Sequence, residues 1–71
     1  MRVTVYLKTP LFAVGHVPEG ASVLEGELLH HGNGALELQV SRYTDGRGKA
    51  LPGTGRRLLL PLSKVDHVVM S

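Results

Sequence analysis

The segment from Arg56 to Met70 reads RRLLLPLSKVDHVVM and carries the densest apolar pattern in the chain. In an extended strand Leu58 and Leu60 fall on one face and Leu59 on the other, so this strand is apolar on both faces. In a chain this small the second face is covered either by the same sheet or by another subunit. We therefore predict that these leucines lie at a contact between subunits.

Pro61 divides this segment, because proline has no N–H to donate to a strand ladder and is confined to edges and bulges. Leu62 to Lys64 is predicted to form a single tight turn. Val65 to Met70 then reads as a last short strand, since β-branched residues favour a pleated, half-buried surface. The C-terminal part of the chain is thus predicted to be two strands joined by one turn.

The chain has 71 residues, enough for one domain, and no cysteine. A domain of this length buries only about 60% of the surface that its unfolded form exposes. Disulfides are excluded as a source of stability, which leaves tight β packing or oligomerisation, and we expect self-association into a homo-oligomer. The absence of cysteine also fits a reducing cytoplasm.

The N-terminal residues MRVTVYLKTPLFAVG alternate between apolar and polar side chains and are interrupted by Lys8 and Pro10. They therefore lack the uninterrupted apolar region of a signal peptide. No stretch approaches the length of a membrane span. We expect a cytoplasmic protein with no membrane partner.

Charge is unevenly distributed, although the formal net charge is only +2. Between Lys8 and Arg42 there are four glutamates and no lysine or arginine, whereas the segment from Arg42 to Arg57 has five of these cations and one acid. Such a segment is in most cases a solvated loop or a partner for acids elsewhere in the fold. Another interpretation is contact with the backbone of RNA or DNA, with a tyrosine stacked on a base. The residues for that contact are Arg42, Tyr43, Arg47, Lys49, Arg56 and Arg57.

Three other segments read as strands. Arg2 to Thr9 and Ala35 to Tyr43 alternate cleanly between apolar and polar residues. Thr9-Pro10 is predicted to turn the chain, because the residue before proline avoids the helical region. Leu11 to Val17 should then return antiparallel to the first strand, with a bulge or a close backbone approach at Gly15.

The segment from Ser22 to His31 has two interpretations. As a helix it begins with a capping box, in which Ser22 is the N-cap and Glu25 follows three residues later. As a strand it alternates around Gly26 and leads into a hairpin loop at His31 to Gly34. Glycine within a helix costs about 1 kcal/mol relative to alanine, which the capping box roughly offsets. We predict the helix and keep the strand as the alternative.

The twelve residues from Thr44 to Gly55, TDGRGKALPGTG, include four glycines and a proline. Their composition predicts a flexible basic loop over 44–55, long enough in so small a domain to be functional or disordered. Together the segments predict a single mainly-β domain over 1–71. Its fold is predicted to be a small antiparallel bent sheet or partly open barrel of four to five strands, with one short helix at about 22–31.

The order of a strand, Leu24-x-Gly26-x-Leu28, Leu36-x-Leu38, a loop and RRLLLPLSKVDHVV resembles the small barrel of Sm-like proteins. In that family a strongly bent sheet closes through two short C-terminal strands separated by a single turn. The family binds RNA through an acidic and asparagine signature between its second and third strands. This chain instead reads His30-His31-Gly32-Asn33-Gly34 there, so no RNA site is transferred from the resemblance.

The chain is also similar to small uncharacterised bacterial proteins of mainly-β type. These open with a strand ending in Thr-Pro, continue through a strand with a central glycine, a turn and a short helix, and end in an apolar segment with a histidine. The resemblance implies no known activity. The matching features here are Thr9-Pro10, Gly15, Pro18-Glu19-Gly20, Ser22 onward and His67-Val68.

Residue types suited to catalysis or metal binding are present but poorly spaced. His30 and His31 are adjacent and point in different directions in a strand or a helix, so we do not expect both to bind one ion. Ser63, Asp66 and His67 are triad types, but they crowd into five residues without room for a triad in series. The loop glycines lack the Ser or Thr that follows the lysine of a phosphate-binding loop.

We therefore predict a non-enzymatic interaction or assembly module that needs no cofactor and no metal and associates with itself. The asymmetry of charge would allow an acidic patch of one subunit to meet the basic loop of the next. The alternative is a nucleic-acid-binding small barrel of the Sm-like kind that uses the basic segment 42–57.

Overall fold

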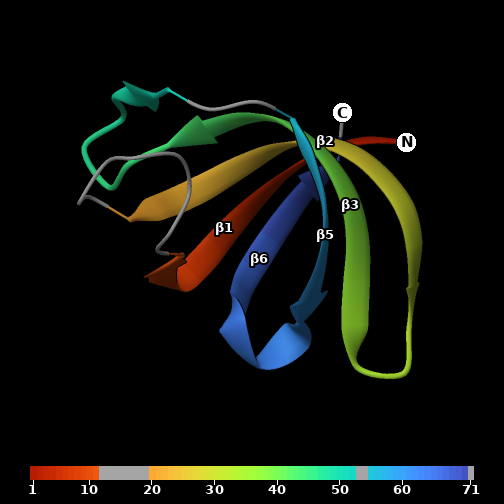
Figure 1. Cartoon of the computed structure of the whole chain (residues 1–71). Helices are drawn as coiled ribbons and strands as arrows, with labels where there is room; N and C mark the ends of the chain where they lie inside the picture. The colour runs from red at the N-terminus through yellow and green to blue at the C-terminus, as the bar shows by residue number, and fades with distance from the viewer. Residues whose placement is uncertain (12–19, 53–54, 71) are drawn as a thin grey trace.

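The structure, a computed structural model, describes residues 1–11, 20–52 and 55–70. They form one antiparallel sheet of six strands, which is not closed, and a single turn of 3-10 helix (Figure 1). The mainly-β fold class and the bent antiparallel sheet are therefore confirmed, but the sheet has six strands rather than the predicted four to five and is not closed into a barrel. The elements are β1 (Arg2–Leu11), β2 (Ala21–Gly32), β3 (Ala35–Thr44), β4 (Ala50–Leu51), β5 (Arg56–Pro61), η1 (Leu62–Lys64) and β6 (Val65–Met70).

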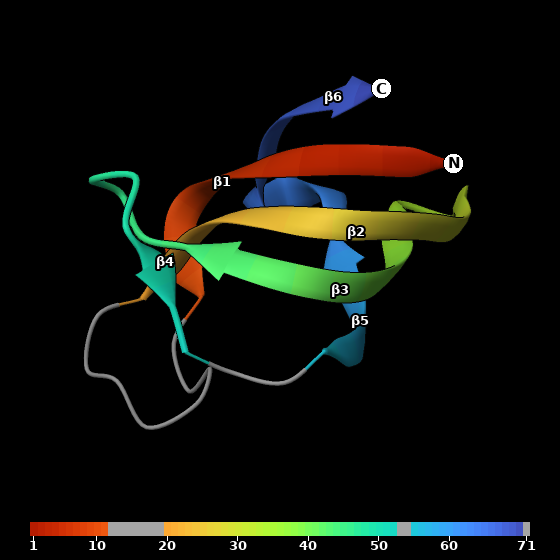
Figure 2. The same ribbon diagram turned by 90° about the horizontal axis from the view of Figure 1, so that it is seen from above.

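The sheet follows the order β4-β3-β2-β1-β6, and β5 pairs with β3 beside β4. Figure 2 shows β6, β1, β2 and β3 as successive neighbours across the sheet. One edge of β3 is divided between its partners, because Ala35 to Val40 pair with β5 and Tyr43 and Thr44 pair with β4. The chain therefore curls from β6 at one end of the sheet to β5 at the other, with η1 joining them.

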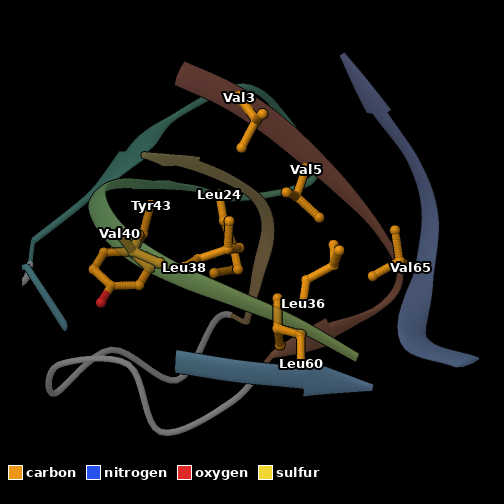
Figure 3. Packing of buried hydrophobic residues seen from close by; sticks show 10 residues of the cluster. Val3, Val5, Leu24, Leu36, Leu38, Val40, Tyr43, Leu60 and Val65 are labelled. Atoms are coloured by element: carbon orange, nitrogen blue, oxygen red, sulfur yellow. The ribbon is translucent and has the colours of Figure 1, made fainter. Parts of the chain in front are cut away.

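Buried apolar side chains from five strands fill the concave side of this curled sheet (Figure 3). They follow the alternation of the strands, since every second residue points to the same face. In β5, for example, Leu58 and Leu60 point inward and Leu59 outward. The buried cluster consists of Val3, Val5, Ala21, Leu24, Leu36, Leu38, Val40, Tyr43, Leu60 and Val65.

The predicted helix at 22–31 is wrong, because this segment lies within strand β2. The capping box is a local preference, whereas β2 pairs with β1 from Ala21 to Glu27 and with β3 from Val23 to Gly32. A helix here would leave one edge of β1 and one edge of β3 without backbone partners. The strand alternative is the correct one, and its hairpin loop, placed at His31 to Gly34, narrows to a turn at Asn33 and Gly34, whose φ angles of 53° and 76° are those of a type I′ turn.

Gly26 lies where β2 bends, next to a bulge between it and Glu25. A Cβ atom on Gly26 would stand 2.1 Å from the carbonyl oxygen of Gln39 on β3. Only glycine permits this approach of the two backbones. Figure 1 shows the resulting curvature of the hairpin formed by β2 and β3.

The other strands and turns predicted from the sequence agree with the structure in part. The strands at the N-terminus, at Ala35 to Tyr43 and at Val65 to Met70 are confirmed, and so is the tight turn at Leu62 to Lys64. The turn at Thr9-Pro10 is wrong, because β1 continues through both residues to Leu11. The predicted returning strand and its bulge at Gly15 lie outside the described residues. The segment 44–55 is not loop throughout, since it contains β4.

Candidate functional site

Tyr43 lies in the core rather than on the surface. The residue is 1% exposed, so its ring presents no open face in this structure to the base stacking predicted for it. The reason is a bulge: Glu25 pairs with Arg42 and Gly26 with Val40, which leaves Ser41 as an extra residue in β3. The alternation of inward and outward side chains is therefore inverted beyond Ser41.

Burial raises the pKa of Tyr43 above its ordinary value of 10.0, and the nearby positive charge of Arg56 opposes part of this rise. The same bulge that buries Tyr43 turns Arg42 outward, where it is exposed. Of the two adjacent residues predicted to contact nucleic acid, Tyr43 is thus buried and Arg42 is exposed.

The basic residues of 42–57 do not form one continuous patch. Arg57 on β5 donates from Nε to Oε2 of Glu37 at 2.6 Å, so its charge is partly used within the chain. Arg56 lies on the same strand and near Tyr43. Arg47 and Lys49 lie in the turn between β3 and β4, and both are exposed. The structure therefore separates a β5 pair from the group around that turn.

Asp45 organises the turn between β3 and β4. Its Oδ1 accepts the backbone N–H groups of Arg47 and Lys49, each at 2.9 Å. These bonds, with Lys49 first, hold the pKa of the Asp45 carboxyl below its ordinary value of 3.8, and the positive charges of the same two residues act in the same direction. A mostly buried carboxylate thus fixes the backbone of the turn, while the side chains of Arg47 and Lys49 remain exposed to solvent.

A groove of about 580 Å³ opens on the outer face of the sheet beside this turn. It crosses the four strands β6, β1, β2 and β3, whose residues stand in register. One row consists of His67, Tyr6, Val23 and Thr44. All four residues line the groove, and Val23 and Thr44 are the short side chains between the two rings and the turn.

The Tyr6 and His67 rings form one wall of this groove. Their centroids are 4.4 Å apart and their planes differ by 8°, so the rings are stacked. His67 Nδ1 also lies 2.9 Å from Oδ2 of Asp66, which fixes the orientation of the ring. Sequence reasoning missed this pair, because the two residues come from opposite ends of the chain and meet only through the pairing of β1 with β6.

The neighbouring row supplies the polar groups of the groove. Thr4 on β1 pairs with Glu25 on β2, and Glu25 pairs with Arg42 on β3. All three side chains line the groove. An acceptor carboxylate and a donor guanidinium therefore stand side by side next to an aromatic wall.

A second hollow of about 490 Å³ adjoins the first. The two share Ser22, Asp45 and Gly46 in their linings. Arg47 and Lys49 line the second hollow only, so the basic part of the turn faces this side. The outer face thus offers an aromatic and polar groove next to a basic one.

The predicted interface residues of β5 differ in exposure. Leu60 is 3% exposed and belongs to the core, and Leu58 is half-buried against it. Leu59 points outward and is 73% exposed. The strand is therefore apolar on both faces, as predicted, and its outer face is uncovered within the chain.

Three strands have a free edge among the described residues, namely β4, β5 and β6, and β4 has only two residues. β5 pairs only with β3 and β6 only with β1, so each has one free edge. β5 and β6 each have six residues. Large apolar side chains are exposed on or between these strands, namely Leu59, Leu62, Val69 and Met70.

Within the parts of the chain that the structure describes, no group of three or more His, Cys, Asp or Glu side chains is arranged to hold a metal ion. In the same residues no helix is long and apolar enough to cross a membrane. Comparisons with protein-family models, with curated proteins and with solved structures found no match to this chain.

Proposed function

We propose that the protein is a non-catalytic assembly module of the cytoplasm that associates with itself through the free edges of β5 and β6. One observation carries the proposal: both ends of the curled sheet expose a strand edge, and exposed apolar side chains accompany both. Unpaired strand edges are templates for pairing with another chain unless they are covered or blunted.

The two edges suit each other. β5 and β6 are equal in length, so the β6 edge of one copy can pair with the β5 edge of the next. Exposed Arg56 on β5 and exposed Asp66 on β6 carry opposite charges, which favours this combination over β5 with β5 or β6 with β6. Pairing of unlike edges is a heterologous contact, which builds a ring or a filament rather than a two-fold dimer.

Burial of exposed leucine and valine would supply the driving force. A large aliphatic side chain contributes about 1.5–3 kcal/mol when it passes from full exposure to full burial. Leu59 is the most exposed apolar side chain of β5, and Val69 and Met70 are exposed on β6. The turn η1 between β5 and β6 is also in keeping with the resemblance to Sm-like proteins, in which two short C-terminal strands are separated by one turn.

The test compares two variants that place the same charge at exposed leucines. Leu59→Asp puts a charge beside the β5 edge, and we expect it to reduce the mass measured by light scattering in line with size exclusion. Leu29→Asp is the control, because Leu29 is also exposed, by 45%, but lies on β2 and not on either of the two proposed edges. A folded Leu59→Asp protein with the mass of the unmodified chain would contradict the proposal. A mass that falls equally in both variants would also contradict it.

Nucleic-acid binding is the second candidate function, and one observation favours it. Arg47 and Lys49 are exposed and make no ion pair among the described residues, and Arg42 lies in the adjoining groove. Three unpaired cations around one turn suit the phosphate backbone of RNA or DNA. Of the residues predicted from the sequence, this candidate function therefore uses Arg42, Arg47 and Lys49. Arg57 should contribute less to binding, because it is paired with Glu37.

The test of this candidate is the salt dependence of binding to a labelled single strand. Replacement of Arg47 and Lys49 by alanine should weaken binding. It should also reduce the slope of the logarithm of the binding constant against the logarithm of the salt concentration by about 2, because two phosphate contacts are lost. Arg57→Ala is the matched control, because its guanidinium is already paired with Glu37. Absence of binding at low salt would remove the candidate.

A further inference from the structure

We propose that the outer-face groove between the Tyr6–His67 wall and the turn at Asp45 holds one unpaired guanine base of a single-stranded nucleic acid. The inference rests on the second candidate function and specifies where the base lies and which base it is. It differs from the prediction made from the sequence, which placed the stacking residue at Tyr43.

The shape of the groove suits a flat ring. Neighbouring strands lie about 4.8 Å apart, so Tyr6 on β1 and Thr44 on β3, two strands away, are separated by about 10 Å. The residue between them in this row is Val23, which is short. The gap leaves room for a ring that lies against the face of Tyr6 opposite to His67. Stacking on aromatic side chains is the common way in which proteins hold unpaired bases.

The polar groups select the base. Glu25 accepts hydrogen bonds and Arg42 donates them, and they are cross-strand neighbours in the groove. The Watson–Crick edge of guanine presents adjacent N–H donors, at N1 and N2, beside the acceptor O6. Guanine therefore matches a carboxylate next to a guanidinium. Adenine and uracil lack the paired donors and would leave the carboxylate with at most one partner.

The acids of the groove do not prevent binding of a polyanion. Asp45 directs Oδ1 to two backbone N–H groups of its own turn. Asp66 is bonded to the ring of His67. The adjoining hollow is basic, since Arg47 and Lys49 line it. A strand that places its base against Tyr6 can therefore place a neighbouring phosphate beside these two cations.

The experiment measures fluorescence anisotropy of labelled single-stranded oligonucleotides at low salt, with the full chain. The probes have one guanine in a uracil background, the same strand with adenine at that position, and the same strand with an abasic site. We expect the guanine strand to bind on the order of ten-fold more tightly than the abasic strand, the range typical of one stacked base. Tyr6→Leu should remove this difference, and Glu25→Gln should remove the preference for guanine over adenine.

Glu27→Gln is the matched control, because Glu27 lies two residues from Glu25 on the same strand but does not line the groove. It should leave the guanine preference unchanged, and far-ultraviolet dichroism should show that all variants keep their strands. Equal binding of guanine and abasic strands, with loss of binding when Arg47 and Lys49 are replaced, would contradict the guanine site in the groove but support nucleic-acid binding. No binding of any strand would overturn both.

Discussion

A Cβ atom built on Gly26 would lie 2.1 Å from the carbonyl oxygen of Gln39, which is closer than any side chain can approach a backbone oxygen. The contact lies in the middle of the sheet, where β2 and β3 bend together. The curvature that encloses the core therefore depends on the absence of a side chain at one position.

Gly26→Ala is expected to destabilise the fold, because β2 or β3 must shift to admit the methyl group. Overpacking of this kind typically costs about 1–3 kcal/mol, and here the neighbour is backbone, so the upper part of that range is expected. Urea denaturation followed by far-ultraviolet dichroism measures the effect. Gly46→Ala is the control, because its Cβ would lie 3.5 Å from Ser22 Oγ, an ordinary contact. Equal stability of the two variants would contradict the account of the bend.

Gly34→Ala tests the hairpin turn rather than the packing. Gly34 has φ of 76°, and a Cβ there would meet nothing within 4 Å. The expected loss of stability is therefore purely conformational and is about 1 kcal/mol, the cost of placing an L-residue in the left-handed region. The same denaturation experiment measures it. A loss as large as that of Gly26→Ala would show that the turn makes contacts that the structure does not contain.

Protonation of Asp45 is expected to destabilise the fold in acid. Its pKa is lowered in the folded protein, so the unfolded chain takes up its proton first as the pH falls. The contribution of Asp45 is present above its ordinary pKa of 3.8 and is lost as the pH falls through the lower, folded-state value. Urea midpoints of the unmodified chain and of Asp45→Asn should therefore converge in this acid range. A constant difference between them from neutral pH to strong acid would contradict the role given to the ionised carboxylate.

Ionisation of Tyr43 is expected to destabilise the fold at alkaline pH. Burial raises its pKa above 10.0, so its contribution is complete below that value and is lost as the pH rises through the folded-state pKa. In a Tyr6→Phe variant Tyr43 is the remaining tyrosine. Its absorbance on alkaline titration should change above pH 10.0 in the folded protein and close to 10.0 in concentrated urea. The same midpoint under both conditions would place Tyr43 on the surface.

Local patterns predicted most of the strands, because alternation with period two and turn residues act over a few positions. The strand of Ala35 to Tyr43 and the turn at Leu62 to Lys64 were found in this way. The capping box at Ser22 is also local, and it misled because the pairing of β2 with two neighbours decides that segment. Pairing with distant strands leaves no signal in the segment itself.

The candidate site was less predictable than the fold for two physical reasons. A single bulge at Ser41 exchanges the directions of Arg42 and Tyr43, so strict alternation places the wrong side chain outside. The stacking of Tyr6 on His67 depends on the pairing of the first strand with the last. The exposed cations Arg47 and Lys49, in contrast, followed directly from the composition of their turn.

The central claim is that unlike free edges of separate copies pair with each other. The most direct measurement is light scattering in line with size exclusion on the unmodified chain, loaded at a series of dilutions. The account predicts a mass that is a multiple of 7.6 kDa and that falls towards this value on dilution. A mass of 7.6 kDa at every concentration would contradict assembly through the edges of β5 and β6.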